Sequence, residues 1–180
     1  AFEANGVTGI PAGKLGTSVS VVTGAELKAR QVRTAAEALR SLPGVSVSQQ
    51  GGVQNQTVVR IRGGESNHTL VLIDGVEVNS PGTDGFLDFA NLLVDDIAQI
   101  EVLRGPQSGL YSSGALGGVI NIITNRGKGP LTFRARAEGG SFDTRDGMVG
   151  LSGGTDRAHA SITLSGRRTN GFDISDDGLE

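Results

Sequence analysis

Ile100-Glu-Val-Leu-Arg-Gly-Pro-Gln-Ser108 and Gly114-Ala-Leu-Gly-Gly-Val-Ile-Asn-Ile-Ile-Thr124 are the two stretches that decide the fold of this chain. Each contains an aliphatic run, Ile100–Leu103 or Val119–Thr124, with the length and the β-branched composition of a strand. Gly105-Pro106 ends the first run, because proline has no amide hydrogen with which to continue a ladder. Residues 107–113, between the two runs, are predicted as a short helix.

Further short elements are expected on the N-terminal side of this pair. The predicted strands are Ser18–Val22, Val45–Ser48, Val58–Arg62 and Leu70–Ile73. Thr23-Gly-Ala-Glu26 and Thr34-Ala-Ala-Glu37 have the spacing of capping boxes, in which threonine and glutamate satisfy free amides at a helix N-terminus. Two short helices are therefore predicted, and Pro43-Gly44 ends the second. Asp74-Gly75, between two aliphatic runs, predicts a hairpin turn. Residues 18–125 together indicate a small mixed domain of helices and short strands.

A strict alternation of apolar and polar residues begins after Pro130. Leu131, Phe133, Ala135 and Ala137 alternate with polar residues, and Ala158, Ala160, Ile162 and Leu164 repeat the pattern. A period of two predicts strands with one apolar and one polar face. Alternation alone favours an ordinary half-buried antiparallel sheet. Strands of about ten residues joined by short turns are also typical of a transmembrane barrel.

The composition excludes several classes of function. The chain has 180 residues, a formal net charge of −3 and no cysteine. This charge gives no basis for nucleic-acid binding, and the lack of cysteine excludes disulfides, thiolate metal sites and cysteine catalysis. The spacing around Ser108 is not that of a nucleophile elbow, the sequence has no phosphate-binding loop, and His68 and His159 lie in different regions. The chain is therefore predicted not to be an enzyme.

Several motifs in a fixed order carry a resemblance to a known family. Besides the two stretches quoted first, they are Ala36-Glu-Ala-Leu-Arg-Ser-Leu-Pro-Gly-Val45, Val59-Arg-Ile-Arg-Gly-Gly64 and Leu70-Val-Leu-Ile-Asp-Gly-Val76. In this order the chain resembles the plug domain and first barrel strands of the TonB-dependent outer-membrane receptors, in the branch of cobalamin and siderophore receptors. The resemblance implies an α+β plug, with a small mixed sheet and short helices, followed by antiparallel strands of a transmembrane β-barrel.

The resemblance also implies three segments and a transport function. Residues 1–17 are expected to be a flexible arm, residues 18–128 the plug, and residues 129–180 the start of the barrel, with about three strands and an outer loop. Such a receptor imports a scarce ligand, such as cobalamin or an iron-siderophore, across the outer membrane of a Gram-negative cell. Its plug gates the barrel lumen and faces the periplasm. The implied partners are TonB, outer-membrane lipid and a small metal chelate, with no nucleic acid.

The number of residues after the plug bears on this interpretation. Only 52 residues follow Lys128 (180 − 128). A barrel of about 22 strands needs roughly 220 residues for its strands alone, so we expect the chain to be a fragment of a longer receptor. The alternative is a standalone plug-like periplasmic module that binds or signals without a barrel.

The resemblance assigns candidate ion-pair and ligand residues. Arg60, Arg62 and Arg104 match the plug arginines that the family pairs with barrel carboxylates, and a guanidinium on a predicted strand requires such a partner. Ligand contacts are expected from the apical loops, at Glu65, Ser66, Asn67, His68, Phe86, Asp88 and Phe89. Polar groups beside aromatic rings suit an amphipathic ligand.

Two further candidate sites lie near the ends of the sequence. Glu3, Val7 and Thr8 belong to a candidate TonB box, the segment that pairs with TonB as an added strand; the alternative places the box before Ala1. Asp173, Ser175 and Asp177 have the spacing of the first half of a calcium loop, and the alternative is an exposed acidic loop. No other cofactor is expected.

Overall fold

The computed structural model describes residues 2–4, 7–10, 18–51, 55–80, 82, 84–111, 113–155 and 157–170. The chain forms two compact units. The first consists of Ala1–Gln50 and Gln56–Thr124, and the second of Gly51–Asn55 and Asn125–Glu180. No helix in the described part of the chain has the length and apolar character needed to cross a membrane.

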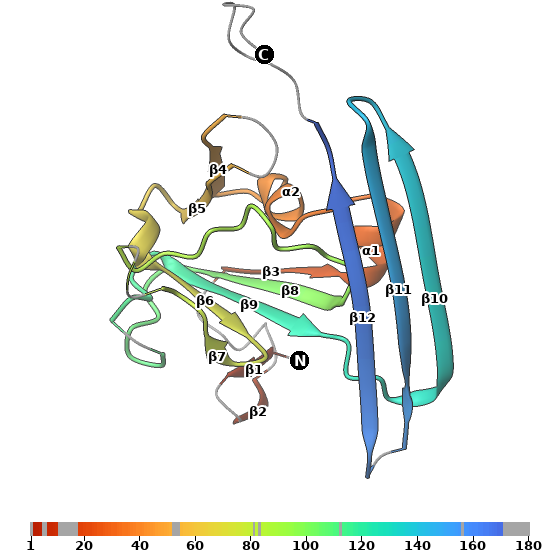
Figure 1. The fold of residues 1–180 in the computed structure, drawn as a ribbon. Coiled ribbons are helices and arrows are strands. Elements are labelled where there is room, and N and C mark those ends of the chain that lie inside the picture. Colours follow the sequence, from red (N-terminus) through yellow and green to blue (C-terminus); the bar gives the residue numbers. More distant parts are fainter. Residues whose placement is uncertain are drawn as a thin grey trace, which may run out of the picture. The chain divides into compact units, whose positions relative to one another are not determined.

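A five-stranded mixed sheet forms the centre of the first unit (Figure 1). Its strands, in spatial order, are β3 (Ser18–Thr23), β8 (Ile97–Arg104), β9 (Gly118–Thr124), β6 (Thr69–Ile73) and β7 (Val76–Glu77). Neighbouring strands are antiparallel except β6 and β9, which are parallel. The two stretches that decide the fold form strands, as predicted, and these strands, β8 and β9, are neighbours in the sheet.

Two short helices follow the predicted capping boxes. In α1 (Gly24–Ala29) the box is formed by Thr23 and Glu26, and in α2 (Ala35–Arg40) by Thr34 and Glu37. The Thr34 hydroxyl accepts a hydrogen bond from the Glu37 amide at 3.3 Å. The boxes satisfy amides that a helix of six residues would otherwise expose at its first turn.

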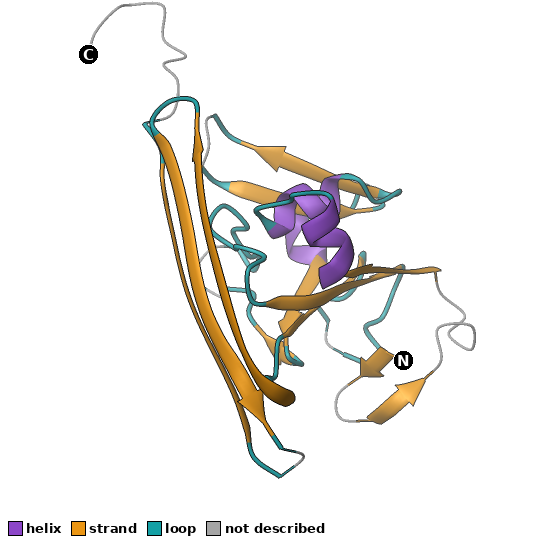
Figure 2. Cartoon of the chain, turned by 90° about the vertical axis from the view of Figure 1, so that its right-hand side faces the viewer, coloured by secondary structure: helices purple, strands orange, loops and turns teal. Residues whose placement is uncertain are grey.

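The helices lie between the five-stranded sheet and a strand pair (Figure 2). That pair is β4 (Val45–Gln49) and β5 (Thr57–Ile61), which run antiparallel. The main core fills the space between these layers. Its fully buried members include Leu39 of α2, Ile61 of β5, and Ile100 and Ile120 of the sheet. Burial of these aliphatic side chains, rather than helix propensity, holds such short helices in place.

The predicted hairpin at Asp74-Gly75 joins β6 to β7. Both residues have positive φ angles, 50° and 84°, as a two-residue hairpin turn of the mirror-image type requires. The Asp74 carboxylate accepts hydrogen bonds from the Thr124 amide at 3.0 Å and from its hydroxyl at 2.6 Å. The turn is thus fixed to the end of β9.

Two segments differ from the sequence-based expectation. Residues 107–111 and 113 form turns and no helix. The Gln107 carbonyl accepts from the Leu110 amide at 3.0 Å and the Tyr111 amide at 3.1 Å, which is a single turn. Hydrogen bonds across the loop also hold the segment, from the Gly105 amide to the Gly117 carbonyl at 2.9 Å and from the Gln107 amide to the Ala115 carbonyl at 2.8 Å. Within the expected N-terminal arm, β1 (Phe2–Ala4) pairs antiparallel with β2 (Val7–Ile10).

The second unit contains an antiparallel three-stranded sheet. Its strands are β10 (Gly129–Gly140), β11 (Thr144–Gly154) and β12 (His159–Arg168). Their register places Ala135, Val149 and Leu164 side by side, so that the apolar positions of the alternating pattern share one face. On the opposite face, Arg136 donates a 2.6 Å hydrogen bond to the Asp146 carboxylate.

Candidate functional site

One edge of the five-stranded sheet gathers the loops that carry Arg62 and the predicted ligand residues 65–68. Ser18 pairs with Arg104, Arg104 with Gly118, and Gly118 with Thr69. The start of β3, the end of β8, and the starts of β9 and β6 therefore meet at this edge. Segment 62–68 connects β5 to the start of β6 here, and segment 105–117 connects the end of β8 to the start of β9.

The predicted ligand residues 65–68 form a compact turn at this edge. Ser66–His68 is a 3₁₀ helix, η2, preceded by Glu65. Glu65 and Asn67 are exposed, whereas Ser66 and His68 are half-buried. The His68 amide donates to the Glu65 carbonyl at 3.0 Å, and the His68 carbonyl accepts from the Gly117 amide at 2.8 Å. The turn therefore presents two polar side chains to solvent while its backbone is held to the loop 105–117.

Asn79 brings the second predicted ligand loop against this turn. Its side-chain amide donates to the carbonyls of Thr69 at 3.0 Å and Gly85 at 2.8 Å, and its oxygen accepts from the Val71 amide at 2.7 Å. A Cβ atom on Gly85 would lie 3.5 Å from the Cβ atom of Asn67. The two stretches predicted separately from the sequence are thus neighbours in the fold.

The three predicted ligand residues at 86–89 have different environments. Phe86 is half-buried and stays available as a predicted ligand contact. The Asp88 carboxylate accepts from the amides of Thr57 and Ala90, both at 2.9 Å, and so fixes the backbone of this loop. Phe89 is only 1% exposed and belongs to the main core. The prediction for Phe89 needs correction, because a ring buried in this way has no surface to offer a ligand.

Arg62 and Arg104 form a pair of cations close to the same edge. Arg104 is 5% exposed and donates to the hydroxyls of Ser18 at 3.1 Å and Ser20 at 2.7 Å. A Cβ atom on Gly44 would lie 3.5 Å from Cδ of Arg104 and 3.9 Å from Cγ of Arg62. Burial lowers the pKa of Arg104, and the nearby charge of Arg62 lowers this pKa further.

The arginine pair has no acidic partner within the described part of the chain. No described carboxylate lies within ion-pair distance of Arg62 or Arg104, and the Arg104 Nε atom is buried without an acceptor there. Two guanidinium groups held together, one of them buried, are unfavourable unless an anion compensates them. Arg60 differs, since it donates to the Ser48 hydroxyl at 3.0 Å on the neighbouring strand β4.

The remaining predicted sites belong to the two ends of the sequence. Glu3 lies in β1, and Val7 and Thr8 in β2, so the candidate TonB box spans a hairpin. Asp173, Ser175 and Asp177 of the candidate calcium loop lie outside the described residues. Among the described residues, no group of three acidic, histidine or cysteine side chains is placed to hold a metal ion.

The structure also shows polar residues that sequence reasoning missed. Glu101, on β8, is 1% exposed and accepts from Gln99 at 2.6 Å and from Asn121 of β9 at 3.1 Å. The ring of Tyr111 packs on a second small core beside this group. Burial first, and the charge of Glu101 second, raise the pKa of Tyr111 to about 12. A glutamate inside an otherwise aliphatic strand was the signal available in the sequence.

A second feature that sequence reasoning missed is the amide-rich end of the β4–β5 pair. The side chains of three glutamines are exposed there: Gln49, Gln50 and Gln56. The backbone amide of Gln50 donates to the backbone carbonyl of Gln56 at 3.0 Å. Glutamines flanking two glycines between predicted strands were the available signal. Their exposed amides can donate and accept hydrogen bonds, as a polar ligand requires.

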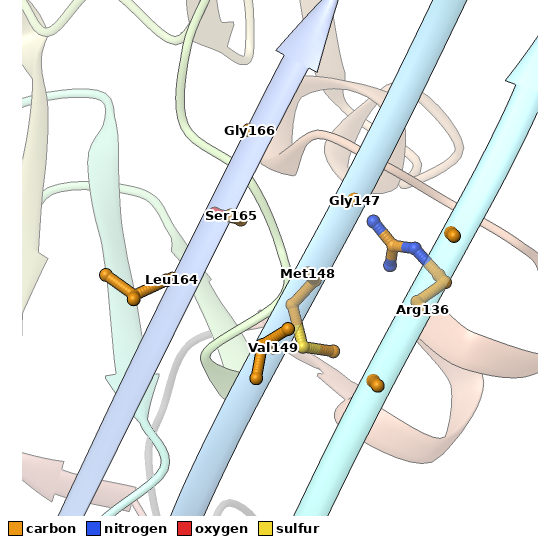
Figure 3. A pocket seen from close by; sticks show the side chains of 9 residues that line it. Arg136, Gly147, Met148, Val149, Leu164, Ser165 and Gly166 are labelled. Carbon is orange, nitrogen blue, oxygen red and sulfur yellow. The ribbon is translucent and has the colours of Figure 1, made fainter.

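The three-stranded sheet of the second unit exposes its apolar face. Leu131, Phe133, Ile162 and Leu164 are between 63% and 76% exposed. A shallow hollow on this sheet is lined in part by Ala137, Gly147 and Gly166, which the register places side by side (Figure 3). The hollow exists because these residues have little or no side chain. Exposed aliphatic side chains in this density mark a surface that is covered by lipid or protein.

The comparison with protein families decides what this fold is. Residues 11–119 match the family model described as the TonB-dependent receptor plug domain. This chain belongs to the TonB-dependent receptor plug family. The mixed sheet with its short helices is therefore a plug, and the β10–β12 sheet follows it as antiparallel strands do in these receptors. This confirms the predicted fold class and the predicted family.

Solved structures of outer-membrane receptors resemble the plug and the strands after it. The ferric yersiniabactin uptake receptor FyuA from Yersinia pestis is 27% identical, with a TM-score of 0.68 over 86% of this chain and 24% of that receptor. The siderophore receptor PirA from Acinetobacter baumannii is 28% identical, with a TM-score of 0.65 over 88% of this chain and 25% of that receptor.

A third solved structure shows the same fold at lower identity. The pyoverdine outer membrane receptor FpvA from Pseudomonas aeruginosa PAO1 is 20% identical, with a TM-score of 0.72 over 85% of this chain and 22% of that receptor. The TonB-dependent plug chain thus spans about a quarter of the length of the receptors it matches. Its family and these matches assign it to the outer membrane, as predicted. The matched proteins are receptors and not enzymes.

Proposed function

We propose that the chain is the gating part of a receptor that imports a ferric siderophore across the outer membrane, driven by TonB. The observation that carries this proposal is the meeting of the turn Glu65–His68 and the loop around Gly85 at one sheet edge, on a plug. Exposed polar side chains on a backbone fixed by hydrogen bonds form a prepared surface for a polar chelate. Phe86 adds a ring to it, whereas Phe89 does not.

The class of ligand is supported by the named neighbours. FyuA and PirA are both siderophore receptors, at 27% and 28% identity. Cobalamin was the other ligand predicted from the sequence, and no neighbour named here favours it. A ferric siderophore offers hydroxamate, phenolate or carboxylate oxygens, which suit hydrogen-bond donors such as Asn67 and His68.

Arg62 and Arg104 are proposed to hold the plug in the barrel. Both cations lack a described carboxylate partner, and a buried guanidinium is stabilised most by a bidentate carboxylate. Carboxylates of barrel strands would supply this partner in the whole receptor. Arg60, also predicted as an ion-pair residue, is already bonded to Ser48 and is the weaker candidate.

The coupling to TonB is proposed at the hairpin of β1 and β2. Glu3, Val7 and Thr8 lie on these two strands. A strand can add a partner strand through its unpaired backbone groups, which is the way an extended segment is captured by a second protein. Asp173, Ser175 and Asp177 stay a candidate calcium site, and calcium is the only cofactor proposed.

The experiment measures uptake by cells that express the whole gene product containing this chain. The host lacks its own siderophore and cobalamin receptors, and the probes are labelled ferric yersiniabactin, ferric pyoverdine and cobalamin. We expect iron uptake from at least one ferric siderophore, and its loss in a host without TonB. Uptake of cobalamin alone would overturn the ligand class. Binding of a siderophore without TonB-dependent uptake would overturn the transport function.

A further inference from the structure

Gly117 joins the predicted ligand turn to the arginine pair through its two backbone hydrogen bonds. Its amide donates to the His68 carbonyl at 2.8 Å. Its carbonyl accepts from the Gly105 amide at 2.9 Å. Gly105 directly follows Arg104 in the chain. Residues distant in sequence are thus connected by a single residue whose donor and acceptor are both used.

The packing around Gly117 leaves little room for a side chain. A Cβ atom at this position would lie 3.1 Å from the His68 carbonyl oxygen and 3.3 Å from that of Ile61. A Cβ atom on Gly64 would lie 3.9 Å from the Cα atom of Gly117. Closely packed groups of this kind transmit a displacement rather than deform around it.

Gly105, the last residue of the hydrogen-bonded series His68–Gly117–Gly105, lies close to Arg62 as well as next to Arg104. A Cβ atom on Gly105 would lie 3.2 Å from Nη1 of Arg62. The φ angle of Gly105 is +110°, which a residue with a side chain rarely adopts. The Gly105 backbone therefore lies close to the Arg62 guanidinium, and a shift of Gly105 alters the space that this group occupies.

We propose that Gly117 is a positioning residue that transmits a displacement of the turn Ser66–His68 to Arg62 and Arg104. The proposal rests on the proposed function, in which the turn contacts the ligand and the arginines hold the plug. A ligand that moves the turn would then shift the arginines from their carboxylates without touching them. The coupling itself is a property of the ligand-free plug, and it is tested there.

The test is a double-mutant cycle on the whole gene product, read by amide hydrogen exchange at Gly105. Asn67→Gly loosens the turn, and Gly117→Ala introduces a methyl group into the tight contact. The matched control is Gly109→Ala, in the same loop, where a Cβ atom meets nothing within 4 Å. We expect Asn67→Gly to speed exchange at Gly105 about threefold in the wild type and in the Gly109→Ala background. In the Gly117→Ala background the effect should disappear.

A second amide distinguishes transmission through Gly117 from general loosening of the loop. The Gln107 amide donates to Ala115 in the same loop and lies outside the connection. Asn67→Gly should speed amide exchange at Gly105 and leave the exchange rate of the Gln107 amide unchanged within measurement error. This comparison needs no Gly117 variant, so it stands even where Gly117→Ala prevents folding.

Two results would overturn the proposal. One is an equal increase in the amide exchange rates of Gly105 and Gln107 on Asn67→Gly, which means that the loop loosens as a whole. The other is the same threefold effect in the Gly117→Ala background. Neither depends on a ligand, so a receptor that shows the coupling but takes up no ferric siderophore would refute the proposed function alone.

Discussion

Arg62 and Arg104 lie against the same residue, Gly44, with their aliphatic carbons 3.9 Å and 3.5 Å from the position of its missing Cβ atom. Gly44 has a φ angle of +72° and accepts a 2.8 Å hydrogen bond from the Arg62 amide. A side chain at this position would be strained and would meet both arginines. Gly44, between α2 and β4, therefore makes room for two like charges.

Replacement of Arg62 by glutamine removes this repulsion. In the 180-residue chain we expect the free energy of unfolding to rise by about 0.3–0.5 kcal/mol at low salt, the size of a like-charge pair near a surface. The gain should vanish at about 1 M salt, because the charges are then screened. Urea unfolding measures both values, in a mild detergent that covers the apolar face of the β10–β12 sheet.

Arg60→Gln is the matched control for this substitution, since Arg60 is bonded to the Ser48 hydroxyl. It should not stabilise the chain at low salt. In the whole gene product we expect Arg62→Gln to destabilise instead, because the proposed barrel carboxylate loses its partner. Destabilisation by Arg62→Gln in the 180-residue chain itself would contradict the repulsion.

Phe89 and Phe86 are two aromatic residues of one loop with different roles. Phe89 is 1% exposed in the main core, and Phe86 is half-buried. Phe89→Ala should lower the free energy of unfolding by about 3–5 kcal/mol, because it leaves a cavity. Phe86→Ala should cost less than half of that. Equal losses in urea unfolding would show that both rings are core residues and would remove Phe86 from the predicted ligand contacts.

Tyr111 is the single tyrosine of the chain, and the chain has no tryptophan. Its titration can therefore be followed by phenolate absorbance alone. Burial raises its pKa to about 12 in the folded state, whereas an unfolded tyrosine ionises near 10. We expect a midpoint near the higher value in buffer and near the lower value in concentrated urea.

This shift has a consequence for stability with a definite sign. The folded pKa lies above the unfolded one, so the contribution is fully present below about pH 10 and is lost as the pH rises towards about 12. The free energy of unfolding should therefore fall within this window. Glu101→Gln should lower the Tyr111 pKa, because the Glu101 charge is the second cause of its rise. If Glu101→Gln leaves the titration midpoint of Tyr111 unchanged, the Glu101 charge is not a cause of the raised pKa.

The apolar face of the β10–β12 sheet should determine how the 180-residue chain behaves in solution. Ile162 and Leu164 are 63% and 72% exposed on this face. We expect the chain to aggregate or bind detergent, and Ile162→Lys with Leu164→Lys to reduce the bound detergent. Ser165→Lys lies on the opposite face and is the matched control. The measurement is light scattering with and without detergent, and an equal effect of the control would argue against a special apolar face.

The elements that depend on neighbouring residues were predictable. Thr34 and Glu37 form the capping box that their spacing implies, and Asp74-Gly75 forms the expected turn. The alternation after Pro130 predicted which side chains share a face of the sheet. In each case the deciding interaction joins residues at most a few positions apart, so its physics is contained in a short window of sequence.

The loop 105–117 and Phe89 show where local reasoning fails. Residues 107–113 have a sequence compatible with a helix, but only one turn forms at Gln107, and hydrogen bonds across the loop, from Gly105 to Gly117 and from Gln107 to Ala115, tie the segment to the rest of the loop. Phe86 and Phe89 occur in the same short, mostly apolar stretch, yet only Phe89 is buried in the core. The loop conformation and the burial of Phe89 both depend on residues that are distant in sequence and become neighbours only in the folded chain. No short window of sequence contains them.

By itself the sequence determined the family, the two capped helices, the strands from β3 to β9 and the two faces of the final sheet, but not the pairing of β1 with β2. Only the tertiary structure decided that β6 lies parallel to β9, that Asn67 faces Gly85, and that Arg62 and Arg104 share the space beside Gly44. The reason is physical: propensity and capping act within one turn or one strand. Burial and the repulsion between charges depend on distances that exist only once separate segments pack together.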